Sequence, residues 1–192
     1  MNQGSHMQVP HLTWRVGIEF ADILHSDLKP DNILLGFSGA PWITDFGLAQ
    51  QIKDTDPTAE RGTVLYKAPE VIERGTPFSF QADVWSFGCV LACILNESEI
   101  PYDLTDDEQS RLAAAKKLED EDARSKALRS LYNSVEREMR VEMRRPVVDA
   151  NQLLCPVVAS CCSREPSHRP SFEIVWQRVG KIQSELAARG SR

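Results

Sequence analysis

The sequence predicts an α+β fold that is mainly α-helical, and three features of the chain support this class. A strongly apolar helix is expected over residues 79–96. Residues 105–145 are highly charged and contain neither Gly nor Pro, which favours further helix. Two short apolar runs, 33–35 and 42–44, are separated by Gly and Pro and predict only a small β-hairpin. The 192 residues are enough for one compact domain.

Composition excludes several classes of protein. The net charge of -6 argues against nucleic acid or an anionic membrane as the main partner, because both bind basic surfaces. The five cysteines are odd in number and form no C-x-x-C pair, so reduced thiols are expected. The longest apolar run, 89–95, is much shorter than the ~20 residues of a membrane helix. We therefore expect a cytoplasmic protein.

The first part of the chain divides into a leader and a helix. Residues 1–11 are polar and irregular, and they are either a remnant of a purification tag or native hinge sequence. Residues 12–24 carry many apolar side chains and few breakers, which predicts a largely buried helix. Residues 45–70 have no sustained period and are expected to form an irregular loop.

The apolar helix over 79–96 contains one isolated carboxylate, Asp83. Burying a carboxylate costs several kcal/mol unless hydrogen bonds offset the loss of water. We therefore expect Asp83 to accept hydrogen bonds from a dedicated partner.

The charged region 105–145 carries a narrow apolar stripe on helical spacing. It is either a docking helix for another protein or a surface insertion that packs on its own domain, and we favour the second alternative. Further helices are expected over 147–159 and 172–188. The stripe consists of Leu128, Leu131, Tyr132, Val135 and Met139.

One segment supplies the groups that phosphoryl transfer requires. Within residues 25–32, Asp27 could orient an attacking hydroxyl, Lys29 could offset phosphate charge, and Asn32 could bind a metal through its amide oxygen. Thirteen residues after Asn32, Asp45 precedes Phe and Gly on a predicted turn and offers a second metal ligand. Each of these short patterns alone is common in unrelated proteins.

Taken together, these patterns resemble a eukaryotic-type protein kinase. Residues 25–32 (HSDLKPDN) resemble its catalytic loop and 45–47 (DFG) its magnesium-binding turn. Three later segments complete the series in the family's order: 62–70 (GTVLYKAPE), 83–88 (DVWSFG) and 161–172 (CCSREPSHRPSF). The last is similar to the motif of tyrosine-kinase-like serine/threonine kinases. The resemblance implies that residues 12–188 form a kinase C-terminal lobe without the N-terminal β-lobe.

The resemblance also implies a role for each matching residue. Asp27 would be the catalytic base, and Lys29 would contact the terminal phosphate of ATP. Asn32 and Asp45 would bind Mg²⁺, while Thr63 would brace Asp27 and Lys29 and favour serine or threonine substrates. Two structural roles are also implied: a buried ion pair between Glu70 and Arg169, and a carboxylate at Asp83 that accepts hydrogen bonds from the catalytic-loop backbone.

The sequence departs from the family pattern in three places. Ser26 replaces the usual Arg, so phosphorylation of Thr55 or Thr58 would lack its normal partner. Leu24 leads directly into His25 without the usual connector. Lys29 is the first lysine of the chain, and no glycine-rich loop precedes it. We therefore expect negligible activity from this chain alone, and an exposed apolar face where the other lobe would dock.

Two functions from different classes remain open. The chain is either a serine/threonine kinase fragment, whose partners are ATP, Mg²⁺ and a protein substrate, or a non-catalytic, pseudokinase-like interaction module. A truncated gene product without a role is the third alternative. The intact Asp27, Lys29, Asn32 and Asp45 favour the kinase, whereas the absent lobe favours the interaction module.

Overall fold

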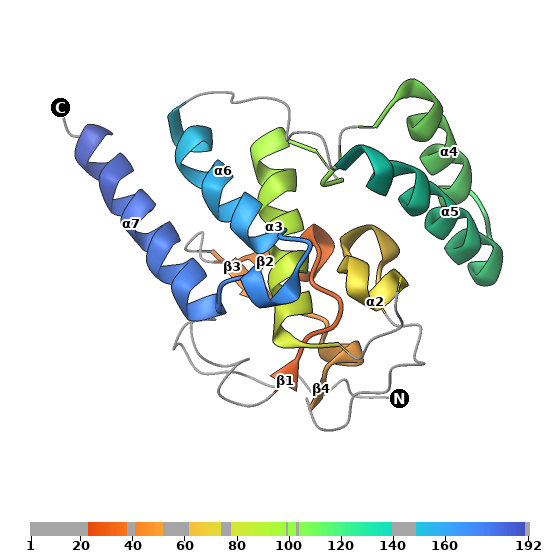
Figure 1. The fold of residues 1–192 in the computed structure, drawn as a ribbon, viewed down its shortest axis with the longest axis horizontal. Coiled ribbons are helices and arrows are strands. Elements are labelled where there is room, and N and C mark those ends of the chain that lie inside the picture. Colours follow the sequence, from red (N-terminus) through yellow and green to blue (C-terminus); the bar gives the residue numbers. More distant parts are fainter. Residues whose placement is uncertain are drawn as a thin grey trace.

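The computed structural model describes residues 23–37, 41–51, 62–73, 78–98, 100–102, 104–139 and 149–190. Within these ranges the chain is mainly helical and has two small antiparallel sheets (Figure 1), as the predicted fold class requires. The strands are β1 (Ile23–Leu24), β2 (Ile33–Leu35), β3 (Pro41–Ile43) and β4 (Gln50–Gln51), and the helices are α2 (Pro69–Glu73), α3 (Phe80–Asn96), α4 (Asp106–Lys116), α5 (Glu121–Met139), α6 (Asp149–Cys161) and α7 (Phe172–Gly190).

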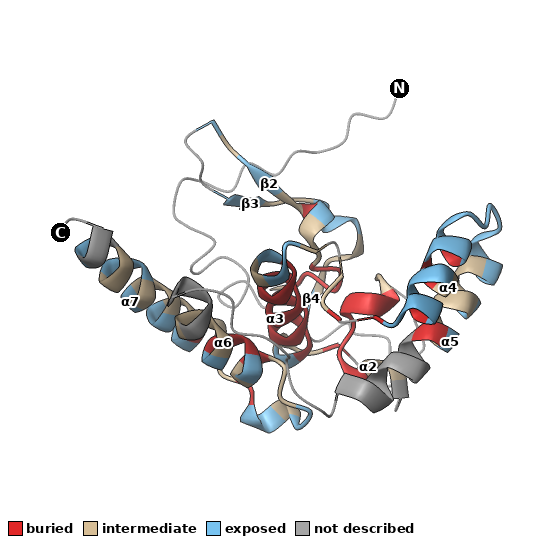
Figure 2. Cartoon of the chain, turned by 90° about the horizontal axis from the view of Figure 1, so that it is seen from above, coloured by how far each residue is buried: buried red, intermediate tan, exposed pale blue. Residues whose placement is uncertain are grey.

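Helix α3 is the centre of the molecule, and the helix predicted over 79–96 is confirmed. It begins after Ser79, whose side chain accepts a hydrogen bond from the Ala82 N–H at 3.3 Å and so satisfies a free helix donor. It ends at Glu97, which adopts the left-handed conformation with φ 48°. Every residue from Ala82 to Cys93 is buried, and Figure 2 shows this helix between α6 and α7 on one side and α4 and α5 on the other.

Two apolar clusters fill the space around α3. One lies toward α5 and the turn Val64–Tyr66, and the other lies toward α6 and α7. The predicted helices over 147–159 and 172–188 are present as α6 and α7, each ending two residues later than expected. No helix in the described part of the chain is long and apolar enough to cross a membrane.

The small sheets confirm one expectation and correct another. The predicted hairpin is present, with Ile33 opposite Ile43 and Leu34 opposite Trp42. The helix predicted over 12–24 is wrong at its end, because Ile23–Leu24 form a strand that pairs with β4. β-Branched Ile23 suits this extended pairing, and the ladder with Gln50–Gln51 satisfies backbone groups that a helix would satisfy internally. Residues 12–22 lie outside the described part.

The loop expected over 45–70 contains short regular pieces within its described residues. Strand β4 follows a 3₁₀ turn at Phe46–Leu48, and a second 3₁₀ turn spans Val64–Tyr66. Helix α2 already begins at Pro69, because proline is well suited to the first position of a helix.

The described part of the charged region, 105–139, forms two helices rather than one. A capping box between Thr105 and Glu108 starts α4, and the Asp120 side chain accepts a hydrogen bond from the Ala123 N–H at the start of α5. Helix α5 packs against α4 and against the turn Val64–Tyr66, and Leu131 is almost completely buried there. This packing supports the alternative of an insertion that packs on its own domain. The side chains of Tyr132, Val135 and Met139 lie outside the described part.

The hairpin β2–β3 exposes several large apolar side chains. Leu35 is 76% exposed and Leu34 56% exposed, and Phe37 and Trp42 beside them are also open to solvent. The hairpin therefore carries an exposed apolar surface, and an exposed apolar face was expected from the sequence.

Candidate active site

Asp83 connects the segment 25–32 to the central helix. Its side chain is completely buried, and its two oxygens accept hydrogen bonds from the backbone N–H groups of His25 (2.7 Å) and Ser26 (3.0 Å). Burial raises the pKa of Asp83 to about 7, and these two donors act in the opposite direction. The isolated carboxylate therefore has the dedicated partner that its burial requires.

His25 connects the same segment to residues 44–46. Its Nδ1 accepts a hydrogen bond from the Asp27 N–H at 3.3 Å, so Nε2 carries the proton and donates to the Thr44 carbonyl at 3.0 Å. The Phe46 ring lies 5.0 Å from the His25 ring, centroid to centroid. Burial lowers the pKa of His25, although the Thr44 carbonyl and the carboxylates of Asp27 and Asp45 act to raise it.

Asp27 is held by three groups from different positions in the sequence. Its Oδ1 accepts a hydrogen bond from the Thr63 N–H at 2.7 Å, and its Oδ2 lies 3.3 Å from Lys29 Nζ and 3.4 Å from Asn32 Nδ2. Lys29 Nζ also donates to Thr63 Oγ1 at 3.0 Å. The structure thus brings Asp27, Lys29, Asn32 and Thr63 into one cluster.

Asp45 joins this cluster through the main chain. The Thr44 N–H and hydroxyl donate to the Asn32 carbonyl at 2.8 and 3.2 Å, which places Asp45 beside the buried Asn32. Asp45 itself is exposed and left-handed, with φ 60°, and its carboxylate accepts from the Gly47 N–H at 3.4 Å. Its side chain therefore bonds to its own turn rather than to Asp27 or Asn32.

Asn32 and Asp45 offer the amide and carboxylate oxygens that Mg²⁺ prefers as ligands. The Asn32 amide nitrogen donates to the Asp27 carbonyl at 2.8 Å, so the amide oxygen on its other branch is directed away from that bond. Mg²⁺ takes one or two protein oxygens and completes its shell with water and phosphate. In the described part of the chain, no three His, Cys, Asp or Glu residues cluster as a larger metal cage would need.

Glu70 and Arg169 form a buried ion pair of two parallel hydrogen bonds, both 2.7 Å long. The guanidinium also donates to the carbonyls of Gln81 and Ser163 and lies 5.0 Å above the Trp85 ring. The pair is almost completely shielded from solvent. It joins α2 to the loop before α7 and to the start of α3.

Sequence reasoning missed the close contact between Gly62 and the segment 25–32. Gly62 has φ +77°, and a Cβ at this position would lie 2.4 Å from the Ser26 carbonyl oxygen. Ser26 is left-handed as well, with φ 65°, and its hydroxyl lies 3.4 Å from the Gln50 amide nitrogen. Only the glycine itself, placed directly before Thr63, could have signalled this approach.

Comparison with known proteins gives one family assignment. Residues 18–179 match the family described as Protein kinase domain. This range includes every site residue described above and covers most of the chain.

Several curated proteins resemble parts of the chain. The mouse protein named Serine/threonine-protein kinase Nek10 is 46% identical over 70 residues, which are 36% of this chain and 6% of that protein. The mouse Serine/threonine-protein kinase 32C is 46% identical over 87 residues, or 43% of this chain and 18% of that protein. The Dual specificity protein kinase shkD of Dictyostelium discoideum is 30% identical over 180 residues, or 92% of this chain and 20% of that protein. The chain thus spans a fifth or less of these relatives.

Proposed function

The chain belongs to the protein kinase family, and on this premise we propose that residues 23–190 form the part of a serine/threonine kinase that receives the protein substrate and holds magnesium. The reaction would move the γ-phosphoryl group of ATP to the hydroxyl of a serine or threonine. One observation carries the proposal: the Asp27 carboxylate is fixed on both oxygens, by the Thr63 N–H and by Lys29 and Asn32. A base held in this way needs little further ordering to orient a hydroxyl.

Each group would act on a different part of the reacting centre. Asp27 would accept a hydrogen bond from the attacking hydroxyl and take its proton as the new O–P bond forms, while the bond between the γ-phosphorus and the β–γ bridging oxygen breaks and ADP leaves. Lys29, whose ammonium is partly exposed and held by Thr63, would turn toward the transferred phosphoryl group and offset its charge. Asn32 and Asp45 would hold Mg²⁺, which when bound neutralises phosphate charge.

The finer assignments are part of the same proposal. The mainly helical architecture and the lack of a large sheet in the described residues support a C-terminal lobe. The segment 161–172 supports the tyrosine-kinase-like group, and its Arg169 makes the ion pair to Glu70. All five cysteines are unpaired, which supports a reducing compartment such as the cytoplasm.

The 192-residue chain by itself is expected to transfer phosphate negligibly. Kinases position the α- and β-phosphates with a lysine that precedes the catalytic loop, and residues 1–28 contain no lysine. Positioning of reactants contributes about 7–11 kcal/mol to such reactions, so its loss removes most of the rate. Nucleotide binding is therefore a more sensitive measure of the site than turnover.

A thermal-shift experiment tests the proposal. We expect Mg²⁺ and ATP together to raise the melting temperature of the chain, and ATP with a chelator to have little effect. Asp45→Asn should abolish the magnesium-dependent part, whereas Asp107→Asn, at an exposed position on α4, should retain it. If the wild-type chain shows no shift with Mg²⁺ and ATP, the proposal fails and the non-catalytic interaction module becomes the better account.

A further inference from the structure

The turn Val64–Tyr66 is the element that delivers Thr63 to Asp27 and Lys29. Two backbone hydrogen bonds close it, from the Tyr66 N–H to the Thr63 carbonyl (3.0 Å) and from the Lys67 N–H to the Val64 carbonyl (3.2 Å). Thr63 directly precedes the turn. Its N–H donates to the Asp27 carboxylate, and its hydroxyl accepts from the Lys29 ammonium. A displacement of this turn would therefore disturb the hydrogen bonds that Thr63 makes to Asp27 and Lys29.

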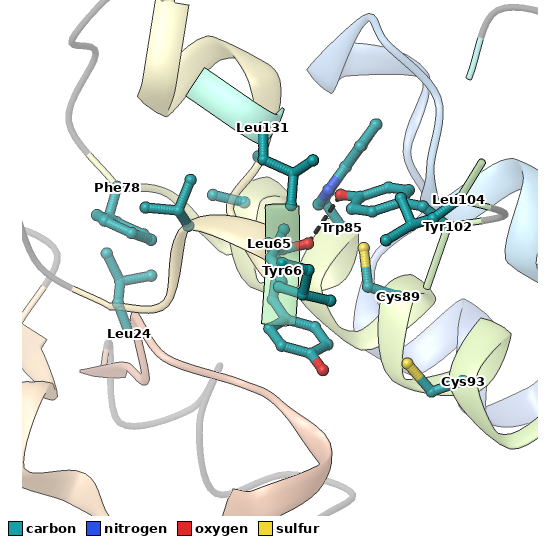
Figure 3. Packing of buried hydrophobic residues seen from close by; sticks show 14 residues of the cluster. Leu24, Leu65, Tyr66, Phe78, Trp85, Cys89, Cys93, Tyr102, Leu104 and Leu131 are labelled. Carbon is teal, nitrogen blue, oxygen red and sulfur yellow. Dashed lines mark hydrogen bonds between the residues drawn. The ribbon is translucent and has the colours of Figure 1, made fainter. Parts of the chain in front are cut away.

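The two backbone hydrogen bonds of the turn use the carbonyls of Thr63 and Val64, and the next two carbonyls, those of Leu65 and Tyr66, are bonded by side chains from other elements. All three residues of the turn are buried, so these carbonyls need donors from elsewhere. The Tyr66 carbonyl accepts from Ser86 Oγ on α3 at 2.7 Å. The Leu65 carbonyl accepts from the Tyr102 hydroxyl at 2.8 Å, a bond drawn in Figure 3.

Tyr102 is well placed to act as a rigid support. It is 6% exposed, and its ring packs in the same apolar cluster as Leu65, Leu104 and Leu131. The residue lies between α3 and α4, so its backbone is attached to the core helix on one side and to the α4–α5 region on the other. An aromatic side chain has few rotatable bonds, and here both its ring and its hydroxyl are engaged.

We propose that Tyr102 is a positioning residue, whose hydroxyl holds the turn Val64–Tyr66 in the place where Thr63 orients Asp27 and Lys29. Tyr102 does not touch the reacting groups and acts only through the turn. The inference rests on the proposed kinase function for its catalytic meaning, but the mechanical link is a property of the folded chain. Sequence reasoning assigned no role to Tyr102, because its partner lies 37 positions away.

The test compares local with global opening of the structure. Tyr102→Phe keeps the ring and removes only the hydroxyl, leaving the Leu65 carbonyl without its donor. We expect amide hydrogen exchange at Thr63 to become about tenfold faster relative to exchange at Leu91, which is buried on the side of α3 that packs in the other apolar cluster. Ser86→Ala should act in the same direction through the neighbouring carbonyl.

Ser160→Ala is the matched control. It also removes a hydroxyl that donates to a backbone carbonyl, that of Val157 at 2.8 Å, but it lies on α6 away from the turn. This variant should leave the ratio of Thr63 to Leu91 exchange unchanged. An equal rise at Thr63 and Leu91 in Tyr102→Phe would show a purely structural role and overturn the proposal, as would unchanged exchange at Thr63.

Nucleotide binding separates this proposal from the proposed function. Asn32 and Asp45 do not belong to the turn, and Lys29 would contact only the transferred phosphoryl group, so Tyr102→Phe should leave the affinity for Mg²⁺ and ADP within about twofold of wild type. A large loss of affinity in this variant would contradict a role confined to the turn. If the wild-type chain does not bind Mg²⁺ and ATP at all, the kinase function fails, while exchange at Thr63 still decides whether Tyr102 holds the turn.

Discussion

At the scale of single residues, the site depends on bonds between backbone and side chains rather than on contacts among side chains alone. Asp83 accepts from the backbone of His25 and Ser26, and Asp27 accepts from the backbone of Thr63. Such bonds fix the path of the chain, and the path in turn fixes where the reactive groups point. A substitution that alters the backbone path should therefore be as harmful as removal of a reactive group.

Gly62→Ala tests this dependence on backbone path. The added Cβ would lie 2.4 Å from the Ser26 carbonyl oxygen, and alanine also disfavours φ +77°. We expect the free energy of unfolding to fall by about 1–3 kcal/mol, the usual cost of a strained backbone. Chemical denaturation would measure this loss. Gly180→Ala, on the open side of α7, is the control and should not destabilise the chain.

His25 should make stability depend on pH. Because its pKa is lowered in the folded chain, the unfolded chain takes up a proton below pH 6.5 that the folded chain resists. The contribution of His25 to stability is thus fully present above pH 6.5 and is lost as the pH falls. The pKa of Asp83 is raised in the folded chain, so its contribution to stability is present at low pH and is lost as the pH rises from about 4 to 7.

The His25 contribution can be isolated by difference. The free energy of unfolding of wild type minus that of His25→Gln should decrease from pH 7.5 to pH 5.5, because Asp83 is present in both proteins. A constant difference for His25 would mean that its ring is as easily protonated in the folded chain as in the unfolded chain.

At the scale of elements, the sequence predicted the helices and strands whose positions are determined by local residue patterns. The apolar run and Ser79 define α3, and the alternation of apolar residues with Gly and Pro defines the hairpin β2–β3. The strand at Ile23–Leu24 was predicted as helix, because its partner Gln50–Gln51 is distant in sequence and gives no local signal. The break between α4 and α5 was missed because Asp120 acts as a cap without any Gly or Pro.

The site was predictable to a similar extent. The residue types and their order indicated Asp27, Lys29, Asn32 and Asp45 through a resemblance, and the structure gathers the first three. The orientation of Asp45 toward its own turn could not be predicted, since it depends on a left-handed φ at a single residue. The support of the turn Val64–Tyr66 by Tyr102 was equally invisible, because only tertiary packing brings them together.

Leu131→Ala tests whether α5 is an integral part of the domain. The side chain is 1% exposed and packs in the cluster around α3, so its truncation leaves a cavity. We expect a loss of about 2–5 kcal/mol in the free energy of unfolding. Leu118→Ala, at an exposed leucine between α4 and α5, should cost much less. Equal and small effects of both variants would indicate that α5 is only loosely attached and favour the docking-helix alternative.

At the scale of the whole molecule, the Glu70–Arg169 pair joins segments 99 residues apart. Removing one partner leaves the other charge buried and unpaired, which costs about 3–5 kcal/mol. Glu70→Ala should therefore lower the cooperative melting temperature of the entire domain rather than weaken one site. Glu119→Ala, at an exposed glutamate, should have almost no effect. Calorimetry would distinguish a lowered single transition from the loss of a local one.

Paramagnetic NMR tests most directly whether Asp27, Lys29, Asn32 and Asp45 form one cation and nucleotide site. Mn²⁺ accepts the same oxygen ligands as Mg²⁺ and broadens the signals of nearby nuclei. With ATP present, substoichiometric Mn²⁺ should broaden the Asn32 side-chain amide and the Gly47 backbone amide first. The account is contradicted if these two signals stay sharp, or if amides at the acidic start of α4 broaden at the same Mn²⁺ concentration.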